Sequence, residues 1–342
     1  MNHKLLVLMS PTARPAFKKQ ALDNLSLVDY DLYYQGLDVR NRRILMISQV
    51  DSLGYDLGLM GIIKDIQESP GGFEGSIGGL IVKSDWDLYT KSSAQNMIFQ
   101  CNCLGLAFVG HSVVEITKDY RNFETWQKTM AMSLEEICFY HCRALIKRLE
   151  AAKKLAGKSI LSLHSSALET SNTLGLWHLV KNNLSFENRE IYIRNGSVAD
   201  CKGCSFQTCI GFGKQASCYY DDIMVEEVLP SIQEADYLVW VCPNYNDSIS
   251  ANLLAVINRL TVLYRQISFH DKGIYAVVVS GNSGSDAVAK QLIGALNINK
   301  GFYLPPKFVI MATANAPLKV LTLEGIHDKA LRMAKRMEEH MG

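Results

Sequence analysis

The chain has 342 residues, of which 48% are hydrophobic and 20% charged, and its formal net charge is +1. This length and composition predict two globular domains and exclude a largely disordered chain. The balance of basic and acidic side chains argues against a nucleic-acid partner. No apolar run approaches the ~20 residues of a membrane helix, so no membrane partner is expected. The nine cysteines favour a reducing, cytoplasmic location over a disulfide framework.

Short apolar runs alternate with helical patterns through the first half of the chain. Strands are expected at residues 4–10, 30–34, 44–48, 78–83 and 106–113, and a long helix over 123–149. The charged stretch 150–158 ends in a glycine-containing turn, which is typical of a helix terminus. We therefore place the domains at residues 1–153 and 154–342.

The second half repeats this alternation with longer parts. Strands are expected at residues 160–164, 190–194, 237–242, 274–280 and 308–312, and helices at 171–183, 222–232, 250–264, 285–296 and 324–340. The strands are apolar on both faces, as parallel strands covered by helices are. The pattern predicts an α/β fold with a doubly wound, five-stranded parallel sheet.

The two halves look like copies of one another. The run 44–49 lies 194 positions before the run 238–243, and 80–84 lies 196 positions before 276–280, as does Gly105 before Gly301. The first strands differ by 155 positions, so the second copy is 39 residues longer between its first and third strands. That extra segment contains Cys201, Cys204, Cys209 and Cys218.

Three loops of the second half share one predicted sheet edge. The loop 164–173 is rich in hydroxyls and enters a helix, whose amides and partial positive charge suit a phosphate. An ordinary helix cap is the alternative interpretation of this loop alone. The loop 242–251 contains asparagine and serine, and the loop 280–285 contains glycine as well. All three loops open at the edge where parallel sheets bind ligands.

These loops resemble the NADPH-dependent FMN reductase and iron–sulfur flavoprotein branch of the flavodoxin-like fold. The resemblance covers residues 158–315. It rests on Ser171-Asn172-Thr173, on cysteines before Asp221-Asp222, and on Pro243-Asn244-Tyr245 followed by Ser250-Ala251 and Asn258-Arg259. The usual arginine of the first loop is replaced by Leu168-Glu169.

The resemblance implies two tandem flavodoxin-like domains, the second of which binds FMN. It assigns the phosphate to Ser165, Ser171, Asn172 and Thr173, and the isoalloxazine ring to Pro243, Asn244, Tyr245, Asn246, Ser248, Ser280, Gly281, Asn282 and Gly284. It also implies an FMN-dependent oxidoreductase, with NAD(P)H as a transient co-substrate and a small molecule or redox protein as electron acceptor. The flavin carries the chemistry, so no side chain is expected to act as a catalytic acid or base.

The first half is expected not to bind FMN. Pro11 and Pro15 remove amides from its first loop, and Asp51 and Asp85 near the strand ends would repel a phosphate. Since members of the resembled family pair to cover each other's flavin, this half is expected to act as a built-in partner. A homodimer is the other way to supply that cover.

The four clustered cysteines, Cys201, Cys204, Cys209 and Cys218, suggest several uses. Four thiolates within 18 residues can converge on a [4Fe-4S] cluster or on zinc. The gap between the second and third cysteines, Cys204 and Cys209, is wider than in iron–sulfur flavoproteins. Free or redox-active thiols are therefore an equal alternative.

Two other functions remain open at this point. A non-enzymatic flavodoxin-like electron carrier is the first, although such carriers are usually strongly acidic. A ligand-free regulatory or interaction module is the second.

Overall fold

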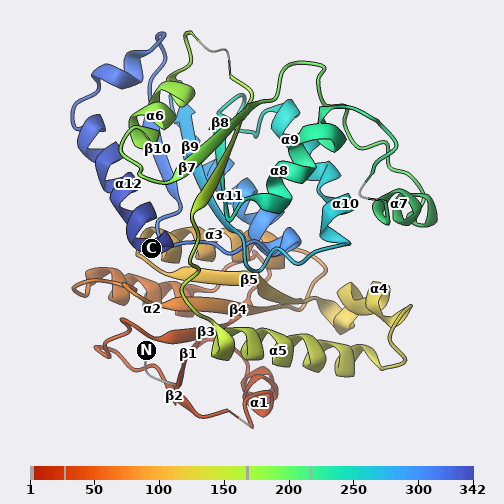
Figure 1. The fold of residues 1–342 in the computed structure, drawn as a ribbon. Coiled ribbons are helices and arrows are strands. Elements are labelled where there is room, and N and C mark those ends of the chain that lie inside the picture. The colour runs from red at the N-terminus through yellow and green to blue at the C-terminus, as the bar shows by residue number, and fades with distance from the viewer. Residues whose placement is uncertain (1–3, 27, 167–168, 216) are drawn as a thin grey trace. The chain divides into compact units, whose positions relative to one another are not determined.

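Parallel strands pair into two separate five-stranded sheets (Figure 1). The computed structural model describes residues 4–26, 28–166, 169–215 and 217–342. The chain divides into two units, Met1–Lys153 and Lys154–Gly342, and each unit contains one sheet. No helix among the described residues is long and apolar enough to cross a membrane.

The first sheet has the strand order β2-β1-β3-β4-β5. Its strands are β1 (Leu5–Met9), β2 (Tyr30–Leu32), β3 (Arg43–Val50), β4 (Ile77–Ser84) and β5 (Ala107–Ile116). Its helices are α1 (Pro15–Asp23), α2 (Leu57–Glu68), α3 (Thr90–Cys103), α4 (Glu124–Gln127) and α5 (Leu134–Ala151).

Helices cover both faces of this sheet, which explains the unbroken apolar runs of its strands. Cys101 of α3 lies 3.8 Å, sulfur to sulfur, from Met46 of β3. A Cβ atom added to Gly79 of β4 would lie 2.9 Å from Leu145 of α5. Met46 and Gly79 are out of phase in the β3–β4 register, so α3 and α5 lie on opposite faces.

The second sheet has the order β7-β6-β8-β9-β10. Its strands are β6 (Ser159–His164), β7 (Glu187–Tyr192), β8 (Tyr237–Pro243), β9 (Gly273–Ser280) and β10 (Val309–Thr313). Its helices are α6 (Asn172–Lys181), α7 (Phe206–Gly213), α8 (Leu229–Glu234), α9 (Ala251–Arg259), α10 (Thr261–Tyr264), α11 (Ser285–Leu292) and α12 (Ile326–Met341). Both sheets therefore follow the 2-1-3-4-5 order of flavodoxin-like folds, which confirms the predicted fold class.

Some expected helices are shorter than the sequence pattern suggested. The helix expected over 123–149 begins only at Leu134, because Ser133 and Glu136 form a reciprocal capping box there. Residues before it form a 3-10 helix (Lys118–Phe123) and α4. The helix expected over 222–232 is a π turn (Met224–Val228) followed by α8, where Pro230 occupies an N-terminal position.

The corresponding glycines of the two halves have the same backbone conformation. Gly105 has φ of +101° after α3, and Gly301 has φ of +84° after the π turn Ile293–Lys300 that follows α11. Both positions end the last crossover helix, where only glycine adopts such angles without strain. The halves differ between the second and third strands. Residues 33–42, all described, contain no helix, whereas α7, the π turn and α8 lie between β7 and β8.

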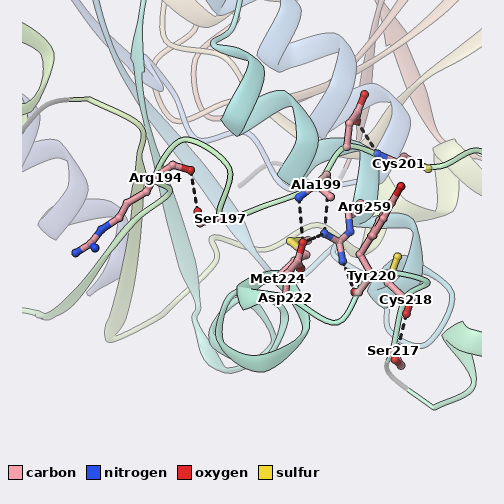
Figure 2. A network of polar contacts seen from close by, with 11 residues as sticks. Arg194, Ser197, Ala199, Cys201, Ser217, Cys218, Tyr220, Asp222, Met224 and Arg259 are labelled. Atoms are coloured by element: carbon pink, nitrogen blue, oxygen red, sulfur yellow. Dashed lines mark hydrogen bonds and ion pairs between the residues drawn. The ribbon is translucent and has the colours of Figure 1, made fainter.

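A buried arginine holds the cysteine-containing segment against α9 (Figure 2). The Arg259 side chain is completely buried and its Nη1 lies 2.5 Å from the Asp222 carboxylate. The same guanidinium donates to the carbonyls of Ala199 at 3.2 Å and Tyr220 at 2.8 Å. Asp222 also accepts from the Ala199 N–H at 3.0 Å. These contacts fix both ends of residues 199–222 to one side chain.

Arg259→Met should release this segment. The substitution keeps apolar volume but leaves Asp222 and two carbonyls without their donor, and breaking a buried pair typically costs about 3–5 kcal/mol. We expect limited proteolysis within residues 199–222 and a lower free energy of unfolding by urea. Arg194→Met, at an exposed arginine of the same region, is the control. Equal protease resistance of both variants would contradict the anchoring role.

His340 is the most strongly perturbed histidine of the second unit. It stacks on Tyr303 with ring centroids 5.4 Å apart, and its Nε2 has no hydrogen-bond partner among the described residues. Burial, with a smaller contribution from the charge of Lys154, lowers the pKa of His340 to about 4. The folded protein therefore keeps this ring neutral where an unfolded chain, with a histidine pKa near 6.5, would protonate it.

The stability of the second unit should fall on acidification through this window. Between pH ~6.5 and ~4 only the unfolded state takes up the His340 proton, which removes up to about 3 kcal/mol of stability. His340→Phe keeps the ring stacking and should show a smaller loss over the same pH range. Urea unfolding at pH 7, 5.5 and 4.5 measures the difference, with His327→Phe at an exposed position as control. Parallel pH profiles for wild type and His340→Phe would exclude this contribution.

Candidate functional site

Three loops of the second unit leave the carboxyl ends of adjacent strands. The first follows β6 and enters α6, the second follows β8 and enters α9, and the third follows β9 and enters α11. Strands β6 and β8 are neighbours, and so are β8 and β9. The strand order reverses at β6, so these loops surround the position where open α/β sheets bind ligands.

The first loop presents a capped helix end. Ser171 is the N-cap of α6, and its hydroxyl accepts from the Leu174 N–H at 3.1 Å. The Asn172 side chain bonds instead to the segment after β10. Its Nδ2 donates to the Ala314 and Ala316 carbonyls, and its Oδ1 accepts from the Val320 N–H at 2.9 Å. Leu168 of this loop, where the family has its arginine, lies outside the described residues.

The two serines after β6 differ in what they contact. The Ser165 hydroxyl lies 2.6 Å from the Ser250 hydroxyl at the start of α9, so it ties the first loop to the second. The Ser166 hydroxyl oxygen is buried and has no hydrogen-bond partner among the described residues. A buried hydroxyl without a partner is unfavourable, and a bound acceptor such as a phosphate would satisfy it.

The second loop makes a tight reversal. Asn246 and Asp247 have φ of 52° and 55°, the pattern of a type I′ turn, which asparagine and aspartate tolerate. Tyr245 and Ser248 bridge across this turn, and the Tyr245 ring is 59% exposed. Gln291 of α11 holds the turn by accepting from the Ile249 N–H and donating to the Asp247 carbonyl.

Asn244 joins the second loop to the third. Its Nδ2 lies 2.9 Å from the Ser280 hydroxyl and 3.1 Å from the Ser283 carbonyl. Its Oδ1 is buried with no hydrogen-bond partner among the described residues. Gly284 has φ of +84°, and a Cβ there would lie 1.9 Å from an Asp247 carboxyl oxygen. The glycine is therefore required for the two loops to approach each other.

A buried histidine lies at the end of β6, where the first loop begins. His164 is buried at the end of β6 and stacks on Tyr192 of β7, with centroids 5.0 Å apart and planes inclined by 6°. Burial lowers the pKa of His164, despite Glu190 at 3.8 Å. Burial opposes ionisation of Glu190, but Lys181 and His178 hold the pKa of this carboxyl below its usual value. The charged side chains of this region therefore pair with Glu190.

The predicted residues lie at one edge of the sheet, but they differ in burial and in their contacts. Thr173 is buried and Pro243 ends β8, whereas Gly281 and Asn282 are exposed in the third loop. The sequence pattern missed Ser166, Ser250 and Gln291. The serine-rich composition of the first loop was a signal for Ser166, but nothing in it distinguishes Ser166 from Ser165.

The buried oxygens of Ser166 and Asn244 fit the requirements of FMN. The first can donate to a phosphate beside the α6 N-terminus, and the second can accept from a polar ring edge. The exposed Tyr245 ring offers an aromatic surface of the right kind for a flavin. Neither of these two oxygens has a hydrogen-bond partner in the described part of the second unit.

The corresponding edge of the first unit contains a buried carboxylate. Asp56, the N-cap of α2, is 2% exposed. Its carboxylate accepts five hydrogen bonds, from the Ser10, Thr12 and Ser48 hydroxyls and the Gln49 and Leu59 N–H groups. The donors of the first and third strand ends are thus already satisfied. Helix α1 begins with Pro15, and its N-cap Arg14 makes no side-chain cap.

The four clustered cysteines do not converge, so the expected [4Fe-4S] cluster and the zinc alternative are not supported. No group of three or more metal-binding side chains occurs among residues 4–26, 28–166, 169–215 and 217–342. Cys204 and Cys209 are separated by the start of α7, which Ser205 caps, so their thiols lie on different elements. Cys218 lies beside Arg259 instead: burial opposes the charge of that guanidinium, while Asp222 and Cys218 raise its pKa. All four thiols, including that of Cys201, are free.

Comparisons with solved structures find proteins of low similarity, some of which are described with a bound flavin. RosB with a bound 8-demethyl-8-formylriboflavin-5'-phosphate intermediate is 14% identical, with 54% of this chain and 81% of RosB covered and a TM-score of 0.38. The Trp repressor binding protein of Bacillus subtilis is 15% identical, with 52% and 98% covered and a TM-score of 0.37. An FMN-dependent NADH-azoreductase of Bacillus anthracis in complex with FMN is 12% identical, with 52% and 99% covered and a TM-score of 0.36. These similarities are too low to carry an argument.

The sequence comparison gives a more direct result. No curated protein sequence matches the chain. Residues 159–316 match the family described as NADPH-dependent FMN reductase, which confirms the resemblance expected for 158–315. The match supports FMN as cofactor and leaves the electron acceptor unspecified. The second unit thus carries the pattern of the NADPH-dependent FMN reductase family, which indicates an NAD(P)H-dependent flavin oxidoreductase.

Proposed function

We propose that the second unit binds FMN between the loops after β6, β8 and β9 and passes electrons from NAD(P)H to a small acceptor or redox partner. The observation that carries this proposal is the family match over residues 159–316, which spans all three loops. The unpartnered buried oxygens of Ser166 and Asn244 give it independent physical support.

In this proposal the first loop holds the phosphate. The Ser166 hydroxyl donates to it, and the first turn of α6 contributes main-chain N–H groups and a partial positive charge. No lysine or arginine is needed, because hydrogen bonds from neutral donors to a charged group are themselves strong. The Ser165–Ser250 contact and the Asn172 contacts keep the helix end in place.

The second and third loops orient the ring. Asn244 locks them together, and the turn at Asn246 and Asp247 holds Tyr245 at the open side of the site. Held by these loops, FMN would supply the two-electron redox chemistry between a nicotinamide and an acceptor. The protein would supply binding and orientation, and the proposal assigns no side chain as a catalytic acid or base. The role of the first unit as a cover for the flavin stays a prediction.

Ser166→Ala tests the phosphate contact. Removing one hydrogen bond to a charged group costs about 1.5–3 kcal/mol, so FMN affinity should fall by about tenfold or more. The stability of the FMN-free protein should stay equal or rise, because the hydroxyl is buried and has no partner among the residues that the structure describes. Fluorescence titration with FMN and urea unfolding measure the two effects.

Ser197→Ala serves as the matched control, since that hydroxyl bonds only to the Arg194 carbonyl. A loss of stability without a change in FMN affinity for Ser166→Ala would show that the hydroxyl has a structural role. Such a result would remove the physical support for the phosphate site.

Steady-state oxidation of NADH or NADPH distinguishes an enzyme from an electron carrier. The FMN-loaded protein should oxidise one of the two nucleotides repeatedly in the presence of a quinone or oxygen. A flavin that is reduced only by a protein partner, and not by either nucleotide, would instead identify a carrier.

A further inference from the structure

The first unit contains a cavity of about 550 Å³ at the carboxyl edge of its sheet. Thr12 and Arg14 line it from the loop after β1, and Trp86 from the loop after β4. Gln49 lines it from the end of β3, Tyr55 from the loop that follows, and Leu57 from the start of α2. All lining residues belong to this unit. The volume lies within the range of small-molecule sites, and the position between β1 and β3 is where the strand order reverses.

The rim of the cavity is apolar and aromatic. Tyr55 is 62% exposed, Leu57 72% and Trp86 43%. Large apolar side chains that gather around a hollow at this level of exposure are typical of a binding site. Tyrosine and tryptophan rings offer flat surfaces on which an aromatic molecule can stack.

Three polar residues that line the cavity bond to one another. The side-chain Oε1 of Gln49 accepts from the Arg14 main-chain N–H at 2.9 Å, and the Gln49 Nε2 lies 3.4 Å from the Asp85 carboxylate. The Arg14 guanidinium lies 2.8 Å from the same carboxylate. Polar groups that are held in place can orient a ligand without first losing mobility.

The chemistry of the cavity disfavours a phosphate group. Asp51 and Asp85 outnumber the single cation Arg14, which is already paired with Asp85. The Ser10, Thr12 and Ser48 hydroxyls, which could otherwise donate to a phosphate, are bonded to Asp56. Lys83 and Lys118 line a neighbouring hollow of about 420 Å³ that shares Arg14, Asp85 and Trp86, and not this cavity.

We propose that this cavity binds a planar aromatic molecule that carries no phosphate group, with its ring against Trp86 and Tyr55. The site is separate from the three loops proposed to hold FMN. The first unit would then have kept the ligand-binding edge of the fold while exchanging phosphate recognition for an internal carboxylate.

The matched probes 1-naphthol and 1-naphthyl phosphate test this proposal. Equilibrium dialysis is run with the full chain saturated with FMN, so that the flavin site is filled. We expect 1-naphthol to bind at one further site, and 1-naphthyl phosphate to bind at least about tenfold more weakly. Trp86→Ala should weaken 1-naphthol binding by about tenfold, whereas Trp86→Phe should largely retain it.

Trp126→Ala is the control, since this exposed tryptophan of the same unit lies outside the lining of the cavity. Equal binding of both probes, or unchanged 1-naphthol binding by Trp86→Ala, would overturn the proposal. Release of FMN by 1-naphthol would overturn it too, because the probe would then occupy the flavin site. If 1-naphthol does not bind and Trp86→Ala changes the sedimentation of the chain, the rim is a protein interface instead.

Discussion

Hydrogen-bond donors at the carboxyl edge of a parallel sheet need acceptors, and the two units satisfy this requirement in opposite ways. In the first unit the Asp56 carboxylate accepts from both the first and the third strand ends. In the second unit no carboxylate takes this position, and the Ser166 hydroxyl stays without a partner among the described residues. One edge has an internal acceptor, and the other is complementary to an external one. The proposed functions of both units follow from that difference.

The loops around the second edge are held by contacts that do not involve a ligand. Asn244 links the second loop to the third, Ser165 links the first to the second, and Asn172 links α6 to the segment after β10. These contacts within the protein restrict the loops, and a restricted site loses less conformational freedom on binding. Some polar residues of the predicted site therefore hold the loops together, and the others remain available to bind a ligand.

The sequence predicted the sheets well because their signal is periodic and local. Each strand is an apolar run that must be covered on both faces, and each was found within a few residues of its observed position. The helix over 123–149 was overestimated because the apolar pattern continues through Ser133, where a capping box starts the observed helix.

The site was harder to predict, since its assignments depend on where side chains point. Ser165 and Ser166 are neighbours of identical type, yet only one bonds to Ser250. The sequence could not identify Asp56 as an internal acceptor, because its partners lie up to 46 positions away along the chain. The cysteine spacing suggested a metal site, but no group of three or more metal-binding side chains occurs in the described part of the chain.

The Arg259 anchor also determines how the cysteine-containing segment can respond to oxidants. The segment is attached to Arg259 through the Asp222 carboxylate and the main-chain carbonyls of Ala199 and Tyr220. None of these groups is a thiol. Oxidation or alkylation of Cys201, Cys204 or Cys209 leaves those contacts intact, so the segment can change its thiol chemistry without detaching from α9. Cys218, next to the guanidinium, is the one position where modification would also disturb the anchor.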